Sequence, residues 1–256
     1  DAVSNNFHLE KLKKQSTGKQ SKQYIYFLRF PAGTDIQQVI EAYYKTGEIE
    51  YVEPDFQGSG GGMLEIIPND QYYAKQWSLN NNGSFPLTPS VVGADIEMQE
   101  AWSIEQGDSN IIVCIIDSGL KLDHPEFAGR IWTNKDEIPG NGIDDDNNDL
   151  IDDVKGWDFA YEDNDPTDDY GHGTNVTGII AANGNNSKGY AGVDWNCKLM
   201  ILKGIDNANY GYYSWWIASI YYAVDHGAKV INMSLGGNGA STGLNNAVIY
   251  ALQHDV

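Results

Sequence analysis

One apolar run, IIVCII at residues 111–116, constrains the fold more than any other segment. A strand with apolar side chains on both faces must be covered on both, as in the middle of a parallel sheet. Helix-like and strand-like patterns alternate after it: residues 175–183, 214–227 and 242–253 have helical spacing, and residues 198–204 and 229–237 have strand character. The alternation predicts an α/β fold with a doubly wound, mostly parallel sheet. In such sheets, functional groups gather at the carboxyl ends of the strands.

The first 57 residues predict a separate, small α+β module. Residues 1–22 are polar and Lys-rich, which predicts loose order. Two expected strands, residues 24–30 and 49–56, flank an expected helix at residues 34–47, which Thr34 would cap and Gly47 would end. Residues 58–68 begin with a Gly-rich stretch typical of a linker or processing region, and residues 69–256 are predicted to form the larger domain.

Charge is the second constraint on function. The chain carries a net charge of −20, and residues 136–170 alone hold fourteen Asp and Glu residues with one Lys. Such a surface repels phosphate, so we expect no nucleic-acid partner. No apolar run is long enough to predict a membrane span. The acidic stretch is either a solvated surface or a set of cation ligands. Cys114 lies in the apolar run, which favours a buried free thiol.

Three short segments carry the chemistry: IIDSG (115–119), GHGTNVTG (171–178) and INMSLGG (231–237). His172 stands between two glycines at the start of a helical pattern, where a histidine could also be a cap or an ordinary surface residue. A nucleotide-binding enzyme would share the expected sheet, but the segment after Asp117 lacks a GxGxxG turn and the chain lacks a GxxxxGK[ST] loop.

Together these segments resemble the subtilisin-like serine proteases, the subtilases, over residues 69–256, and the calcium-rich thermitase-like members look most similar. The resemblance implies an incomplete subtilisin-like fold in which Asp117 and His172 are two members of an Asp-His-Ser triad. We then expect an Asp117 carboxylate oxygen about 2.6–3.2 Å from His172 Nδ1. The resemblance also implies that the nucleophilic serine and an oxyanion-hole asparagine follow Val256, so that this chain is a fragment and inactive alone.

The same resemblance assigns the substrate site and the role of the first module. Ser234, Leu235 and Gly236 resemble the edge strand that pairs with an extended polypeptide substrate. Tyr213 matches an aromatic residue that walls a substrate pocket, although packing against Trp215 and Trp216 would also explain it. Residues 24–56 resemble the end of an inhibitory propeptide, which implies that the first module inhibits its own protease until processing removes it.

Ca²⁺ is the expected cofactor, because it prefers the carboxylate, amide and carbonyl oxygens that the acidic loops offer. The spacing of residues 141–153 resembles the start of a calcium loop, without the glycine and distal Glu of an EF-hand. The family resemblance implies two further sites, one of which would add carbonyls from the NNSKGY loop. The three expected ligand sets are Asp144, Asp146, Asn148 and Asp152; Asp158, Asp165 and Thr167; and Asp70, Glu126 and Asn186.

The sequence as a whole predicts the precursor of a secreted, calcium-stabilised serine endopeptidase. The competing hypothesis is a non-catalytic calcium-binding or scaffolding relative of the same family.

Overall fold

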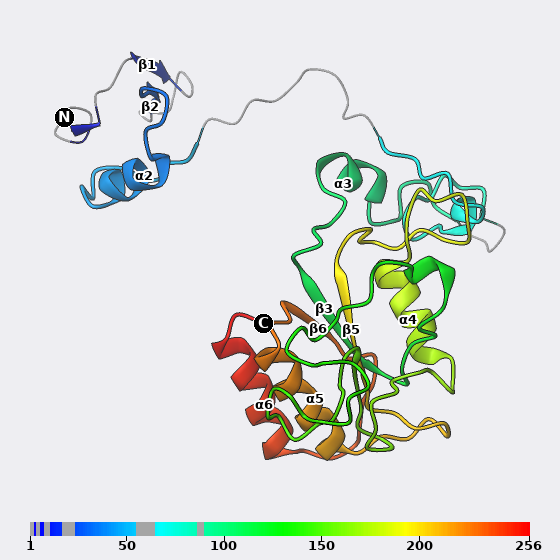
Figure 1. Ribbon diagram of the computed structural model, residues 1–256. Helices are drawn as coiled ribbons and strands as arrows, with labels where there is room; N and C mark the ends of the chain where they lie inside the picture. The colour runs from blue at the N-terminus through cyan, green and yellow to red at the C-terminus, as the bar shows by residue number, and fades with distance from the viewer. Residues whose placement is uncertain (1–2, 4–5, 8–10, 17–23, 55–64, 86–89) are drawn as a thin grey trace. The chain divides into compact units, whose positions relative to one another are not determined.

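A computed structural model describes residues 3, 6–7, 11–16, 24–54, 65–85 and 90–256. The chain divides into two compact units, residues 1–62 and 63–256, and each is described by itself (Figure 1). Residues 58–64, most of the expected linker, lie outside the described residues.

The first unit differs from its predicted strand–helix–strand order. Strand β1 (Lys11–Ser16) lies in the segment expected to be loosely ordered and pairs antiparallel with β2 (Tyr24–Arg29), because backbone pairing accepts a polar sequence. Helix α2 (Ile36–Tyr44) is capped by Asp35, whose carboxylate accepts a hydrogen bond from the Gln38 N–H, and not by Thr34. The expected strand at 49–56 is wrong over residues 49–54, which form no strand, and its last two residues are not described.

The second unit is built on a four-stranded sheet. The strands are β3 (Ile112–Asp117), β4 (Gly156–Asp158), β5 (Lys198–Lys203) and β6 (Val230–Asn232), in the order β4-β5-β3-β6. Every pairing is parallel, and β3 has a neighbour on each side. The prediction of an interior parallel strand at residues 111–116 is therefore confirmed.

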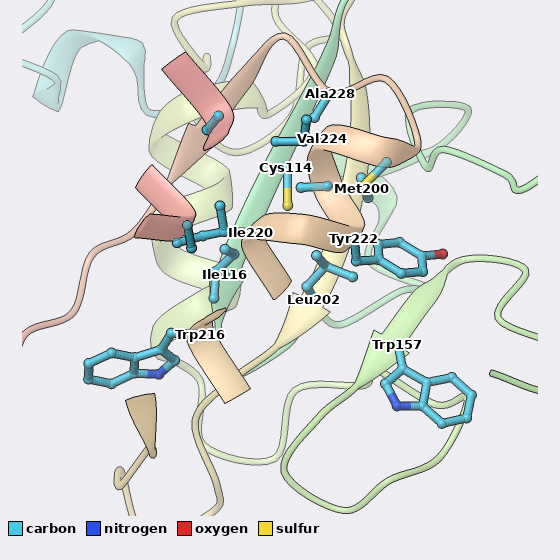
Figure 2. Packing of buried hydrophobic residues seen from close by; sticks show 13 residues of the cluster. Cys114, Ile116, Trp157, Met200, Leu202, Trp216, Ile220, Tyr222, Val224 and Ala228 are labelled. Carbon is cyan, nitrogen blue, oxygen red and sulfur yellow. The ribbon is translucent and has the colours of Figure 1, made fainter. Parts of the chain in front are cut away.

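Alternate side chains of β3 enter two different apolar clusters. Cys114 and Ile116 face α5 (Tyr213–Asp225) and α6 (Thr242–Gln253), together with Met200 and Leu202 of β5 (Figure 2). Val113 and Ile115 lie in the other cluster, which includes Ala181 of α4 (His172–Ala181). Burying each large aliphatic side chain contributes about 1.5–3 kcal/mol. Helices thus cover both faces of a parallel sheet, which confirms the α/β prediction.

The lengths of three predicted elements need correction. The strand expected at residues 229–237 ends at Asn232, so the SLGG segment follows β6 and is not part of it. Helix α4 begins at His172, three residues before the predicted range, and α5 spans Tyr213–Asp225. The helical pattern did not predict α3 (Met98–Ile104) or two short 3₁₀ turns, η1 (Tyr73–Lys75) and η2 (Pro125–Phe127).

Among the described residues, helices are too short or too polar to cross a lipid bilayer.

Candidate active site

A buried carboxylate and a half-exposed imidazole meet at the carboxyl end of β3. Asp117 is the last residue of the strand, and its side chain is fully buried. Its Oδ1 lies 2.7 Å from His172 Nδ1, which confirms the expected distance. The same oxygen accepts the Ser118 N–H over 2.7 Å, whereas Oδ2 is buried without a hydrogen-bond partner among the described residues.

The glycines beside His172 account for its position. Gly171 has φ 102°, a conformation that side-chain-bearing residues rarely adopt, and it precedes the first turn of α4. A Cβ at Gly173 would lie 2.2 Å from the Gly119 carbonyl oxygen, so only glycine lets the helix approach the strand end this closely. His172 therefore opens α4 directly beside Asp117.

The contact with Asp117 also decides the chemistry of the ring. An ionised carboxylate only accepts hydrogen bonds, so Nδ1 of His172 carries the proton and donates it. Nε2 of the neutral ring is then left with a free lone pair. The side chain of His172 is 42% exposed, so this basic nitrogen is open to an incoming group. The arrangement can accept a proton from a hydroxyl placed beside Nε2.

Asp168, which we did not predict as a site residue, fixes the start of α4. Its Oδ1 accepts the Ser118 hydroxyl over 2.9 Å and the Gly171 N–H over 2.7 Å. Its Oδ2 accepts the N–H and the hydroxyl of Thr174, and Ser118 Oγ accepts the Gly173 N–H. Two orphan N–H groups of the first helical turn are thereby satisfied. Burial opposes ionisation of Asp168, but hydrogen bonds led by Thr174 lower its pKa below the ordinary value.

The expected substrate segment presents unpaired backbone groups. Ser234, Leu235 and Gly236 follow β6, and no backbone hydrogen bond joins them to another described residue. The Tyr213 hydroxyl donates to the Gly239 carbonyl over 2.9 Å and accepts the Gly239 N–H over 3.1 Å. Its ring also packs beside Trp216, so Tyr213 fixes the loop after the segment as well as contributing to the core.

Asp70 and Glu126 both contact the loop that contains Asn186. Asp70 and Glu126 are both buried, at 6% and 7% exposure. Asp70 Oδ2 accepts the Asn185 N–H over 2.6 Å, and Glu126 Oε2 accepts from the Asn186 amide over 2.9 Å. Asp70 Oδ1 is buried with no hydrogen-bond partner among the described residues. An unpaired, buried carboxylate oxygen costs free energy unless a cation or another donor satisfies it, so these residues fit a hard cation.

Of the four ligands expected in the acidic loop, two belong to a tight cluster, one lies beside it and one has other partners. Oxygens of Glu137, Asp144 and Asp146 lie within 4.8 Å of one another, and Glu137 is a member that we did not predict. Asn148 is close to this cluster because its N–H donates to Asp144 and Asp146. Asp152 instead accepts the backbone N–H groups of residues 140–142, so its carboxylate organises the turn.

A second group in the same region includes a histidine. One ligand atom each from Asp146, Asp153 and His226 lies within 4.8 Å of the others, and Asp153 is fully buried. The amide of Asn134 bridges the two carboxylates, and the Tyr222 hydroxyl donates to Asp153. This network joins the acidic loop to α5, and neither Asp153 nor His226 was predicted from the sequence.

In the expected set of Asp158, Asp165 and Thr167, Asp158 is paired with a lysine and the other two residues are bonded to each other. Asp158 Oδ2 is paired with Lys203 Nζ at 3.0 Å, and Asp158 Oδ1 accepts the N–H groups of Ala160 and Tyr161. Asp165 accepts the Thr167 hydroxyl and N–H through Oδ1. A Ca²⁺ ion at Asp158 would have to compete with an internal ammonium group.

Comparison with known proteins identifies what the chain resembles. A family profile described as the subtilase family matches residues 108–256. "Subtilisin-like protease 1" of Plasmodium berghei is 34% identical over 183 residues, which cover 71% of this chain and 28% of that protein. "Thermitase" of Thermoactinomyces vulgaris is 36% identical over 156 residues, covering 61% of this chain and 48% of that protein. This chain therefore spans less than half of each relative.

A solved structure gives the same result for the fold. It is described as proteases from Pseudoalteromonas arctica PAMC 21717 and superposes with a TM-score of 0.51 at 25% sequence identity. The match covers 73% of this chain and 56% of that one.

Proposed function

The chain belongs to the subtilase family, and we propose that it is part of a secreted, calcium-stabilised serine endopeptidase precursor, with Asp117 and His172 as two members of its catalytic triad. The 2.7 Å contact between these two side chains carries the proposal. The thermitase relative supports a thermitase-like subgroup for this chain.

Proton transfer through His172 is the proposed catalytic step. A serine hydroxyl is a weak nucleophile until a base removes its proton, and His172 Nε2 would be that base. The ring becomes positively charged at that moment, and the buried Asp117 carboxylate stabilises the imidazolium while holding Nδ1 in place. No described serine is hydrogen bonded to His172. The nucleophilic serine of the proposed triad is therefore not assigned to a described residue.

The proposed substrate is an extended polypeptide. The free backbone groups of residues 234–236 can pair with a substrate main chain, which gives affinity for many sequences. Tyr213 would wall one side-chain pocket because its hydroxyl holds the adjoining loop at Gly239.

Ca²⁺ is the proposed stabilising ion. Asp70, Glu126 and Asn186 would hold it, since Asp70 Oδ1 is buried and has no hydrogen-bond partner in the described part of the chain. Glu137 joins Asp144, Asp146 and Asn148 in a second proposed set. Bound Ca²⁺ would supply positive charge that offsets repulsion among the carboxylates, and would take no part in peptide hydrolysis.

Residues 1–57 are proposed to be the carboxyl-terminal part of an inhibitory propeptide, with cleavage between Phe56 and Asn69. Their formation of a compact unit, with its own apolar cluster around Val39 and Tyr43, supports this assignment. Amino-terminal sequencing of the mature, secreted protein tests it. A mature start upstream of Tyr24 would contradict it.

Activity of the full-length protein tests the triad. We expect hydrolysis of a chromogenic peptide substrate, and a loss of about four orders of magnitude in kcat for Asp117→Asn, which removes the charge and disturbs the tautomer. Asp108→Asn is the matched control, because that exposed carboxylate bonds no described residue other than Asn110 in its own turn. If the wild-type protein neither cleaves peptides nor reacts with a fluorophosphonate serine probe, the chain belongs to a non-catalytic calcium-binding or scaffolding relative.

A further inference from the structure

Three adjacent strands end in charged side chains at the same level of the sheet. Lys203 ends β5 and is the register partner of Asp117 on β3 and of Asp158 on β4. Paired residues of parallel strands point to the same face, so all three side chains lie on the face that α4 covers. Lys203 is 2% exposed and Asp158 is 1% exposed. A buried lysine requires a specific reason, because lysine is almost never buried without a partner.

The ammonium group of Lys203 is paired with two carboxylates, one at the end of β4 and one in the turn before α4. Its Nζ lies 3.0 Å from Asp158 Oδ2 and 2.9 Å from Asp169 Oδ2. It also lies 4.4 Å from the centroid of the Tyr161 ring, a cation–π contact. Burial by itself would lower the pKa of Lys203, but the bonds to Asp169 and Asp158 outweigh it and raise that pKa. The group therefore stays charged.

Asp169 belongs to the turn that leads into His172. Its neighbour Asp168 is bonded to Ser118, the residue next to Asp117. Asp169 is bonded to Lys203, the register partner of Asp117. Two consecutive carboxylates thus attach the turn to the ends of two neighbouring strands. The turn is therefore held at two points, one at each strand end.

From this geometry we propose that Lys203 is a positioning residue for His172. Its ammonium group holds the turn through Asp169, and this contact keeps the imidazole of His172 against Asp117. Lys203 acts through Asp169 and contacts neither His172 nor the reacting atoms. The kinetic part of this inference rests on the proposed protease function, but the structural part does not.

A simpler role for Lys203 is to neutralise the buried carboxylate of Asp158. The two roles predict different consequences when Asp169 is removed. If Lys203 only neutralises Asp158, Asp169→Ala leaves the Asp158 pair intact and has no effect on His172. If Lys203 positions the turn, Asp169→Ala releases His172 even though Asp158 and Lys203 remain paired.

The experiment compares Asp169→Ala with Glu162→Ala in the full-length protein. Glu162 lies in the same loop, and its side chain is exposed and makes no hydrogen bond or ion pair with another described residue. The first readout is the low-field NMR signal of the His172 Nδ1 proton, assigned by its loss in His172→Gln. The second is kcat and KM for a chromogenic peptide.

We expect Asp169→Ala to increase solvent exchange of the Nδ1 proton and to lower kcat about 10- to 100-fold, with KM little changed, since small displacements of a catalytic group cost this much. Glu162→Ala should behave as wild type. Lys203→Arg should retain the signal, whereas Lys203→Met leaves Asp158 unpaired and can fail to fold. A wild-type Nδ1 signal and kcat in Asp169→Ala would overturn the inference. If the wild-type protein shows no peptidase activity, the proposed function fails, and the Nδ1 signal still decides the role of Lys203.

Discussion

Ser118 and Asp168 are fifty residues apart in the sequence and are joined by a hydrogen bond of 2.9 Å beside the Asp117–His172 pair. Ser118 Oγ also accepts the Gly173 N–H, so one hydroxyl links the end of β3 to the first turn of α4. His172 is thus held in two ways. Polar contacts join it and its turn to the end of β3, and the close approach of Gly173 to Gly119 packs the start of α4 against that strand end.

Removing the Ser118 hydroxyl should loosen this junction. Ser118→Ala leaves the Gly173 N–H without its acceptor and removes one donor from Asp168, and we expect a loss of about 1–3 kcal/mol in the free energy of unfolding. Ser241→Ala is the control, since Ser241 caps α6 through the Leu244 N–H, far along the chain from His172. Both variants should lower stability in chemical denaturation, but only Ser118→Ala should lower kcat. Equal kcat values in the two variants would contradict a role for Ser118 in holding the site.

Asp168 should make the protein sensitive to acid. Its folded-state pKa is lowered, so it contributes stability that is fully present above the unfolded value, about 3.9, and that is lost as the pH falls towards the folded value. We expect Asp168→Asn to lower the free energy of unfolding at pH 7 and to reduce its decline below about pH 4. Denaturant titrations of both proteins across this range measure the effect. Parallel pH profiles would show that Asp168 does not contribute.

Two glycines of α4 provide a test of close packing. Gly173→Ala places a Cβ 2.2 Å from the Gly119 carbonyl oxygen, and overpacking of this kind costs about 1–3 kcal/mol or more. Gly178 lies in the same helix with open space around the position of a Cβ. Gly178→Ala should therefore be neutral or should stabilise by up to about 1 kcal/mol, because alanine favours helix. Thermal melts compare the two, and a Gly173→Ala protein as stable as Gly178→Ala would refute the close approach.

Calcium should stabilise the full-length protein through Asp70. A ligand that binds only the folded state contributes about 2.7 kcal/mol at a hundredfold excess over its Kd. We expect chelator to lower Tm and Ca²⁺ to restore it, with Mg²⁺ less effective because it demands octahedral geometry. Asp70→Asn should reduce this response and Asp108→Asn should not. A Tm that chelator leaves unchanged would reduce the acidic segments to solvated surface.

The sequence predicted the elements whose patterns are strong. The apolar run of β3 and the helical spacing of α5 and α6 each produced the expected element, because burial dominates their free energy. Where the pattern was weak, the predicted secondary structure was wrong. Polar β1 forms by pairing with β2, which no local signal reveals, and residues 49–54 alternate like a strand without forming one in the described chain.

The residues of the candidate site likewise include some that the sequence predicted and some that it did not. Asp117 and His172 stand in distinctive motifs and were predicted, and the distance between them is as expected. Lys203 was not predicted, because its burial depends on two carboxylates from separate segments. The Asp158 carboxylate looked like a free calcium ligand for the same reason, since sequence spacing does not show which charges meet in space.

The free backbone of residues 234–236 has a consequence for how the protein behaves in solution. Backbone N–H and C=O groups that have no hydrogen-bond partner among the described residues are available to another chain, and residues 234–236 of a second molecule offer the same groups. The net charge of −20 keeps molecules apart at low ionic strength. At about 1 M salt the Debye length falls to about 3 Å, and this protection disappears. Crowded or salty preparations should therefore favour self-association through the segment that would otherwise receive substrate.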